Sequence, residues 1–407
     1  MRGSVAERSE GGGRMSTKNN PRVGPLAARG GEAPSLDVDG LLRDPGTQVI
    51  VCCGSGGVGK TTTSAALALR AAEMGRKVVV LTIDPARRLA QSMGIEKLDN
   101  VPRPVPGVDG SAGGSLDAMM LDMKRTFDDV VLAQASPEKA QSILNNPFYV
   151  TLSSSFAGTQ EYMAMEKLSQ LRQDSRKSGR WDLIVVDTPP ARSALDFLDA
   201  PERLSGFLDG RFIRLLLAPA KGPARLMTSG MGMVTSTMAK IVGAQVLKDL
   251  QMFVAAFDTL FGGFRNRAQQ TFEMLQTRET AFLVVAAPEP DALREAAYFV
   301  ERLDSEHMPL AGLVVNRATA GLDGLSAEQA VAAAERLESH GGSASAGATA
   351  GMLRLHADRM RRVARERRLR QRFSAAHPHV PTAVVPALST DVHDLAGLRQ
   401  VGDLISR

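Results

Sequence analysis

The stretch that decides the fold is TQVIVCCGSGGVGKTTTSAALALRAAEMGRKVVVLTID, residues 47–84. It opens with a short apolar run typical of a buried strand and continues into an Ala- and Leu-rich segment with helical spacing. That segment stops at Gly75, a good helix terminator, and a second apolar run follows. A strand, a glycine-rich turn, a helix and a strand form a βαβ unit, which predicts a parallel sheet.

The turn inside this unit, GSGGVGKT at residues 54–61, fits the phosphate-loop pattern G-x-x-x-x-G-K-[ST] at every fixed position. Its glycines let the backbone wrap closely and aim N–H groups at phosphate oxygens, aided by the helix N-terminus. We expect Lys60 to reach the β- and γ-phosphates, Thr61 to ligate Mg²⁺ and Thr62 to bond the α-phosphate. The expected nucleotide-binding residues of the loop are Gly54, Ser55, Gly56, Gly57, Val58, Gly59, Lys60, Thr61 and Thr62.

Two acidic residues follow buried apolar runs. Asp187 ends the run in WDLIVVDTPP, where a lone carboxylate is costly unless it faces an ion or a donor. A place near Mg²⁺, through a water molecule, answers that cost. Asp84, in LTIDPARRLA, is a candidate to orient an attacking water towards the γ-phosphate. For both residues the alternative is a helix cap.

The rest of the chain extends the same pattern. Further buried strands are expected at residues 114–122, 181–190, 280–288, 310–318 and 379–388, with helical segments between them. We therefore expect an α/β fold: a doubly wound, mostly parallel phosphate-loop NTPase core with an inserted helical subdomain. The expected organisation is a disordered tail over residues 1–46 and a single ATPase domain over 47–407, with helical insertions at about 124–180 and 191–280.

Composition narrows the classes of function. The 49 basic and 44 acidic residues leave a net charge of +5, which alone indicates no nucleic-acid partner. The two cysteines, Cys52 and Cys53, are neighbours in a strand, so they point to opposite faces and are expected to be small core residues. We expect no transmembrane segment, no secretory signal and a cytoplasmic location.

Three motifs in order, GSGGVGKTTT, DPAR and DTPP, resemble the arsenite-pump and tail-anchored-protein-targeting ATPases, the ArsA and Get-pathway family. The resemblance covers roughly residues 47–407 and implies a dimer that binds ATP and Mg²⁺ at the subunit interface. It assigns the water-positioning role to Asp84, phosphate and metal contacts to Lys60 and Thr61, and the second acidic position to Asp187. The segments VVNR and VVPALSTDVHDL are similar to the family's adenine-binding strand and loop, which implies base contacts from Asn316, Pro386 and Ala387.

Ser55 departs from the family pattern, which has a lysine that crosses the dimer to the partner's phosphates. A homodimer of this chain would lack that lysine at both sites. Either another cation substitutes, with Arg87, Arg88 and Arg192 as candidates, or the partner is a lysine-bearing paralogue in a heterodimer. A paralogue would place the lysine in only one of the two sites, so one site would be fast and the other slow or silent.

Two further segments leave alternatives open. Residues 227–264 carry methionines and an apolar stripe at helical spacing, which suits either an apolar client surface or packing against a neighbour. Residues 352–373 carry nine arginines over a stripe of Leu353, Ala357, Met360 and Ala364, which suits either peripheral membrane contact or a solvated helix face.

The sequence therefore predicts an ATP hydrolase, a nucleotide-gated dimer that couples ATP hydrolysis to handling of a hydrophobic or protein client. The alternative is a weakly catalytic structural subunit of a heterodimer. An arsenite pump is less favoured because the family's usual thiolate ligands are missing. A positioning switch of the MinD and ParA kind is also less favoured, because the insertions are long.

Overall fold

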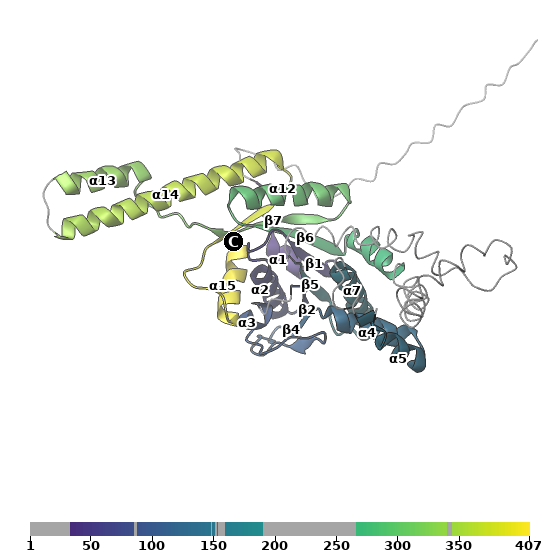
Figure 1. Ribbon diagram of the computed structural model, residues 1–407. Coiled ribbons are helices and arrows are strands. Elements are labelled where there is room, and N and C mark those ends of the chain that lie inside the picture. Colours follow the sequence, from purple (N-terminus) through teal and green to yellow (C-terminus); the bar gives the residue numbers. More distant parts are fainter. Residues whose placement is uncertain are drawn as a thin grey trace, which may run out of the picture.

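The computed structural model describes residues 33–84, 88–147, 149–150, 153, 159–189, 266–339 and 344–407. Within them eight strands form one sheet in the order β3-β4-β2-β5-β1-β6-β7-β8 (Figure 1). The strands are β1 (Val49–Cys53), β2 (Lys77–Thr82), β3 (Arg103–Pro104), β4 (Ser115–Met120), β5 (Leu183–Asp187), β6 (Thr280–Ala286), β7 (Leu310–Ala318) and β8 (Thr382–Pro386). Neighbours pair in parallel except β3 with β4, which confirms the mostly parallel sheet.

Helices cover both faces of this sheet, as expected for a doubly wound fold (Figure 1). They are α1 (Val38–Arg43), α2 (Lys60–Glu73), α3 (Arg88–Ser92), α4 (Met123–Gln134), α5 (Pro137–Leu144), α7 (Thr159–Ser178), α12 (Pro290–Ser305), α13 (Ala327–Ser339), α14 (Ala344–Ala376) and α15 (Leu395–Ile405). One apolar layer joins the sheet to α2, α3 and α15, and the other joins it to α4, α7 and α12. The first expected insertion is helical in its described part, whereas the second lies largely outside the described residues.

Strand alternation in β1 places the two cysteines in different layers. Cys52 packs in the layer of α2, and Cys53 packs in the layer of α7 and α12. Both thiols are unbridged and buried, and burial raises the pKa of each to about 12. Both are therefore neutral core side chains, as the sequence predicts.

The expectation of disorder up to residue 46 is wrong for residues 33–46. Pro34 and Leu36 add hydrogen bonds to Thr382 at the edge of β8, and α1 follows. The nearly buried Arg76 side chain donates to the carbonyl oxygens of Leu42, Asp44 and Thr47 at 2.9–3.0 Å. One arginine, distant in sequence, therefore satisfies the backbone of a segment too short to show helical periodicity by itself.

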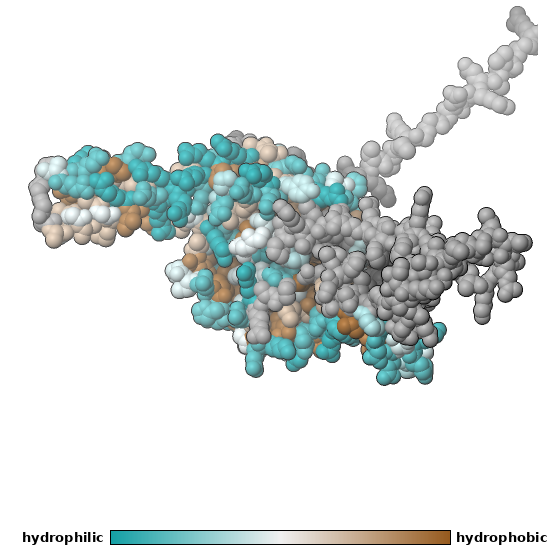
Figure 2. Space-filling model, viewed as in Figure 1, coloured by the Kyte–Doolittle hydropathy of each residue, from teal (hydrophilic) through white to brown (hydrophobic). Residues whose placement is uncertain are grey.

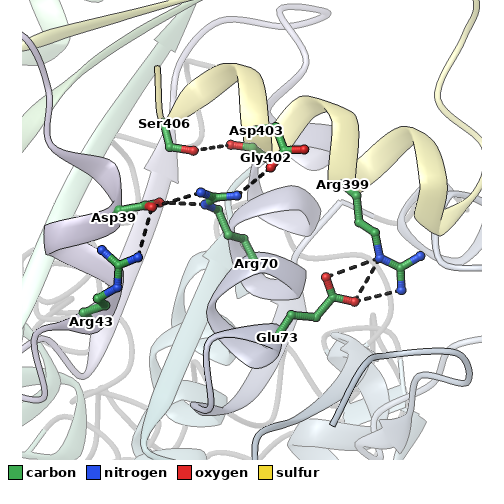
Figure 3. Close-up of polar contacts among 8 residues, drawn as sticks. All are labelled: Asp39, Arg43, Arg70, Glu73, Arg399, Gly402, Asp403 and Ser406. Carbon is green, nitrogen blue, oxygen red and sulfur yellow. Dashed lines mark hydrogen bonds and ion pairs between the residues drawn. The ribbon is translucent and has the colours of Figure 1, made fainter. Parts of the chain in front are cut away.

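Charged contacts hold α15 against α2 and α1 (Figure 3). Arg70 of α2 bonds Asp39 at 2.6 and 2.9 Å and Asp403 at 2.8 Å. Glu73, one turn further along α2, accepts from Arg399 at 2.8 Å. These contacts fix α1 and α15 to α2, the helix that follows the phosphate loop, so the segment between β8 and α15 is held beside that loop.

Helices α13 and α14 lie side by side and project beyond the sheet (Figure 1). A capping box opens α13: the Ser326 hydroxyl accepts from the Gln329 N–H at 3.2 Å and the Gln329 amide oxygen accepts from the Ser326 N–H at 2.8 Å. Ala357 is buried between the helices with Leu353 and Met360 packed around it, but Ala364 is exposed, so the expected stripe ends one turn earlier. The stripe stops where α13 has no further residues to cover it.

The visible surface of this hairpin is largely hydrophilic, with small apolar areas (Figure 2). Several arginines of α14 are tied locally, as in the pair of Arg354 with Glu338 and the bond from Arg359 to the Ala320 carbonyl oxygen. Among the helices described, none combines the length and apolar character needed to cross a membrane.

Candidate nucleotide-binding site

The loop at residues 54–59 leaves β1 at the carboxyl edge of the sheet and enters α2 at Lys60. Gly54 and Gly59 have φ values of 147° and 95°, which only glycine adopts without strain. A Cβ on Gly54 would overlap the carbonyl oxygen of Val285 in β6, and one on Gly59 would overlap the side-chain amide of Asn316. The loop is therefore pressed against β6 and β7, and its path requires glycine at both positions.

Lys60 opens α2 and folds back under the loop. Its Nζ donates to the carbonyl oxygens of Gly54 at 2.9 Å and Ser55 at 2.8 Å. Burial lowers the pKa of Lys60, and the nearby Asp187 carboxylate opposes that shift. Phosphate oxygens are stronger acceptors for an ammonium than backbone carbonyls, so this lysine is placed to exchange the loop contacts for phosphate contacts.

Asp187 is the last residue of β5, level with Cys52 of β1 and Thr82 of β2, and it is fully buried. Its Oδ2 accepts from the Thr61 hydroxyl at 2.7 Å and from the Thr82 hydroxyl at 2.8 Å. Its Oδ1 is buried and has no hydrogen-bond partner among the described residues. Burial raises the pKa of Asp187 to about 6, against the lowering effect of the two hydroxyls.

This pair of residues fits a divalent cation. Magnesium prefers hard oxygen ligands, and it is commonly held by one or two protein oxygens, with phosphates and waters completing its shell. The Thr61 hydroxyl lies at the mouth of the loop, and the unpaired Oδ1 of Asp187 is an acceptor beside it. A cation there would also offset the burial of the Asp187 charge.

Asp84 follows β2 at the same edge of the sheet and is partly buried. Its charge contributes to the raised pKa of Asp187, which places the two carboxylates in one electrostatic neighbourhood. Asp84 also shares a cavity with Lys60 and Thr61. Asp84 and Asp187 therefore both lie at the carboxyl edge of the sheet, beside the phosphate loop.

A cavity of about 780 Å³ collects most of the predicted site, a volume typical of small-molecule sites. The predicted residues that line it are Gly57, Gly59, Lys60, Thr61, Thr62, Asp84, Asn316, Pro386 and Ala387. The predicted loop residues Gly54, Ser55, Gly56 and Val58 do not line the cavity, nor does Asp187, which accepts from Thr61. The cavity therefore runs from the loop to the segment after β8 where base contacts are expected.

The end of β7 clamps the loop. Asn316 donates from Nδ2 to the Val58 carbonyl oxygen at 2.9 Å, and its Oδ1 accepts from the backbone N–H of Arg317 at 2.9 Å. Arg317 in turn donates from its guanidinium to the Gly57 carbonyl oxygen at 2.9 Å. Arg317 lines the cavity but was not singled out by the sequence; its place directly after Asn316 was the available signal.

Other residues that line the cavity were not named from the sequence. Gln91 and Ser92 of α3 belong to no quoted motif, whereas Thr188 stands in DTPP, and Leu388, Thr390, Asp391, Val392 and His393 stand in VVPALSTDVHDL. Thr188 has a structural reason for its position, because its hydroxyl donates to the Cys52 carbonyl oxygen at 2.8 Å. The stretch after β8 reaches the cavity because α15 holds its far end against α2.

Ser55 is 9% exposed, and its hydroxyl is buried without a hydrogen-bond partner among the described residues. The side chain therefore points into the protein. Of the three arginines considered as substitutes for a lysine here, Arg88 lines the cavity. Arg87 and Arg192 lie outside the described residues.

A glycine-rich loop between a central parallel strand and a helix, with an acidic residue at the end of the adjacent strand, defines a phosphate-loop nucleotide-binding protein. The sequence profile of the anion-transporting ATPase family matches residues 47–328, well over half of the chain. The chain belongs to this family and is an ATP-hydrolysing enzyme. The family match confirms the resemblance stated from the motifs.

Named relatives agree with this assignment. The chain is 26% identical over 299 residues to a protein named ATPase ASNA1 homolog 2 from Paramecium tetraurelia, covering 68% of this chain and 78% of the relative. It is 26% identical over 285 residues to ATPase get3 of Schizosaccharomyces pombe, covering 69% and 76%. It is 27% identical over 303 residues to ATPase GET3 of Podospora anserina, covering 74% and 82%.

Proposed function

We propose that the cavity beside the phosphate loop binds ATP with Mg²⁺ and that this chain hydrolyses the nucleotide there. The observation that carries the proposal is the convergence of Lys60, Thr61, Asp84 and Asn316 on one cavity. Lys60 and the loop N–H groups hold the β- and γ-phosphates, and Thr61 with Asp187 holds the cation, Asp187 through a water. When bound, Mg²⁺ offsets charge on the phosphate oxygens.

Hydrolysis needs a water in line with the bond between the γ-phosphorus and the β-bridging oxygen. In the proposed role, Asp84 accepts a hydrogen bond from that water and orients it towards phosphorus, so that phosphate and ADP are the products. Lys60 then stabilises charge on the transferred group. Asp187 has a different task, because its carboxylate is committed to Thr61 and Thr82.

The adenine end of the site is proposed to lie between β7 and the segment after β8. Nδ2 of Asn316 uses one N–H on the Val58 carbonyl oxygen, which leaves a second N–H for a ring nitrogen of the base. Pro386 and Ala387 line the same cavity and offer an apolar edge and backbone groups. This arrangement couples base binding to the loop, because one amide contacts both.

The functional unit is proposed to be a dimer gated by nucleotide. Ser55 is neutral and turned inward, so this chain presents no cation to a partner from that position. The first form of the proposal is a heterodimer with a paralogous ATPase that carries a lysine there. The second is a homodimer in which another cation, such as Arg88, serves the partner's phosphates.

Hydrolysis is proposed to drive the handling of a hydrophobic or protein client. This part rests on the family relationship and on the methionine-rich segment 227–264, which lies outside the described residues. A second candidate, a weakly catalytic subunit that mainly binds nucleotide, is favoured by the inward-facing Ser55. The two candidates differ in whether ATP is hydrolysed in this chain's own site.

The test is sedimentation velocity of the purified full chain without nucleotide, with Mg·ADP and with Mg·ADP plus beryllium fluoride. It is paired with a native pull-down scored by mass spectrometry for a chain that carries G-K-G-G-V-G-K-T. The proposal predicts association with that chain or, without it, a homodimer that forms with the phosphate analogue. A monomer under every condition, with no such chain captured, would refute the dimer.

A further inference from the structure

We propose that Arg317 binds the phosphate groups of the nucleotide directly, as a second cation of this chain's own site. The inference rests on the proposed nucleotide site and adds a residue to it. Arg317 is exposed, lines the cavity and donates to the carbonyl oxygen of Gly57 in the phosphate loop at 2.9 Å. A cation tied to the loop in this way lines the same cavity as Lys60 and Thr61.

The backbone at this position is held in an unusual state. Arg317 has φ of 59°, a left-handed conformation that is rare for a residue with a long side chain. The register between β7 and β8 shifts between Val315 and Ala318, which is where Asn316 and Arg317 lie. Such irregularities re-aim side chains and cluster at functional sites. Here the irregularity turns both residues towards the loop.

The side chain keeps capacity for a ligand. A guanidinium has five N–H donors, and among the described residues its bond to Gly57 is a contact with a neutral carbonyl. Within the described chain no carboxylate is paired with Arg317, so its positive charge is not neutralised by an ion pair. A planar guanidinium matches the oxygens of a phosphate, which makes it a good partner for the ligand that the loop encloses.

The charge balance of the residues that line the cavity favours a phosphate-binding role for Arg317. Lys60, Arg88 and Arg317 are the lysines and arginines that line it in the described part of the chain. Asp84 and Asp391 line the same space, so the cavity is close to neutral before a polyanionic nucleotide enters. Without Arg317 the carboxylates would largely offset the remaining two cations, and phosphate binding would weaken.

The competing explanation is that Arg317 only clamps the loop through Gly57. Two variants separate charge from clamp. Arg317→Gln keeps a neutral N–H donor on a shorter side chain, and Arg317→Lys keeps the charge. A clamp requires a donor and is indifferent to its charge, whereas a phosphate contact requires the charge. Arg294→Gln is the matched control, because Arg294 is an arginine of α12 that is not among the cavity-lining residues and whose side chain is 76% exposed.

The experiment titrates fluorescent N-methylanthraniloyl-ATP and -ADP into the full chain with Mg²⁺ at several KCl concentrations. Binding of these nucleotides by the wild type tests the proposed function. A failure of the proposed function would therefore show in the wild type, whereas a failure of the Arg317 inference would show only in the variants. We expect Arg317→Gln to weaken binding at least tenfold and flatten its salt dependence, and Arg317→Lys and Arg294→Gln to stay within about threefold. Wild-type binding by Arg317→Gln, or equal losses in the glutamine and lysine variants, would overturn the inference.

Discussion

Asp187→Asn separates the cost of burying a carboxylate from its use in binding a cation. Because burial raises the pKa of Asp187 to about 6, while an unfolded aspartate has a pKa of about 3.9, the folded chain binds this proton more tightly. Protonation of the Asp187 carboxyl therefore adds to the free energy of unfolding. This contribution is complete below about pH 4 and is lost as the pH rises through about 6. At pH 7.5 the loss amounts to about 3 kcal/mol, and at pH 5 to roughly half of that.

Asparagine does not ionise, so the variant escapes this loss. Its amide can still accept from Thr61 and Thr82, but its N–H₂ group takes the place of the unpaired Oδ1 and costs about 1–3 kcal/mol at any pH. The absolute stabilities of the two proteins therefore come out similar. The informative quantity is the change between pH values: relative to wild type, the variant gains about 1–2 kcal/mol between pH 5 and pH 7.5.

The assay is urea unfolding of nucleotide-free protein at pH 5, 6, 7 and 7.5, with Asp304→Asn as an exposed control. A second readout is the stabilisation by Mg·ATP, about 2.7 kcal/mol for the wild type at a hundredfold excess over Kd, which we expect the variant to lose. A difference from wild type that does not move with pH would refute the raised pKa. Full stabilisation of the variant by Mg·ATP would refute the metal-site role.

The remaining predictions concern the loop. Gly59→Ala puts a Cβ into the Asn316 amide at a φ of 95°, so we expect loss of nucleotide binding and a stability loss of about 1–2 kcal/mol, checked by titration and thermal unfolding; unchanged binding would show that the loop relaxes freely. Ser55→Lys supplies the missing cation, so we expect partner-free ATPase activity to rise at least several-fold over both wild type and Ser55→Ala; unchanged activity would show that the cation is not what limits this chain.

The sheet and the loop could be predicted from sequence because their signals are local. An apolar run, a glycine-rich turn and an Ala-rich helix lie next to one another in the chain, and the parallel sheet then brings Asp84 and Asp187 to one edge. Residues 33–46 carry no such signal. The ordered structure of residues 33–46 depends on contacts with Arg70 and Arg76, which lie about thirty residues further along the chain.

Arg317 illustrates why the rest of the site could not be predicted. A positive φ and a register shift place Arg317 at the phosphate loop. No sequence pattern marks either feature when the residue is an arginine. Ala364 is the opposite case, because its helical spacing suggests burial, yet α13 does not extend over it. In both cases a neighbouring element, and not the local sequence, decides what the side chain contacts.

The central claim is that this chain hydrolyses ATP in its own site with Asp84 as the water-positioning residue. The most direct test is steady-state Mg·ATP turnover of Asp84→Asn, measured beside nucleotide affinity, with any partner chain present. We predict that turnover falls at least about a hundredfold while the Kd for ATP stays within about threefold of wild type. Turnover that survives in the variant would contradict the claim.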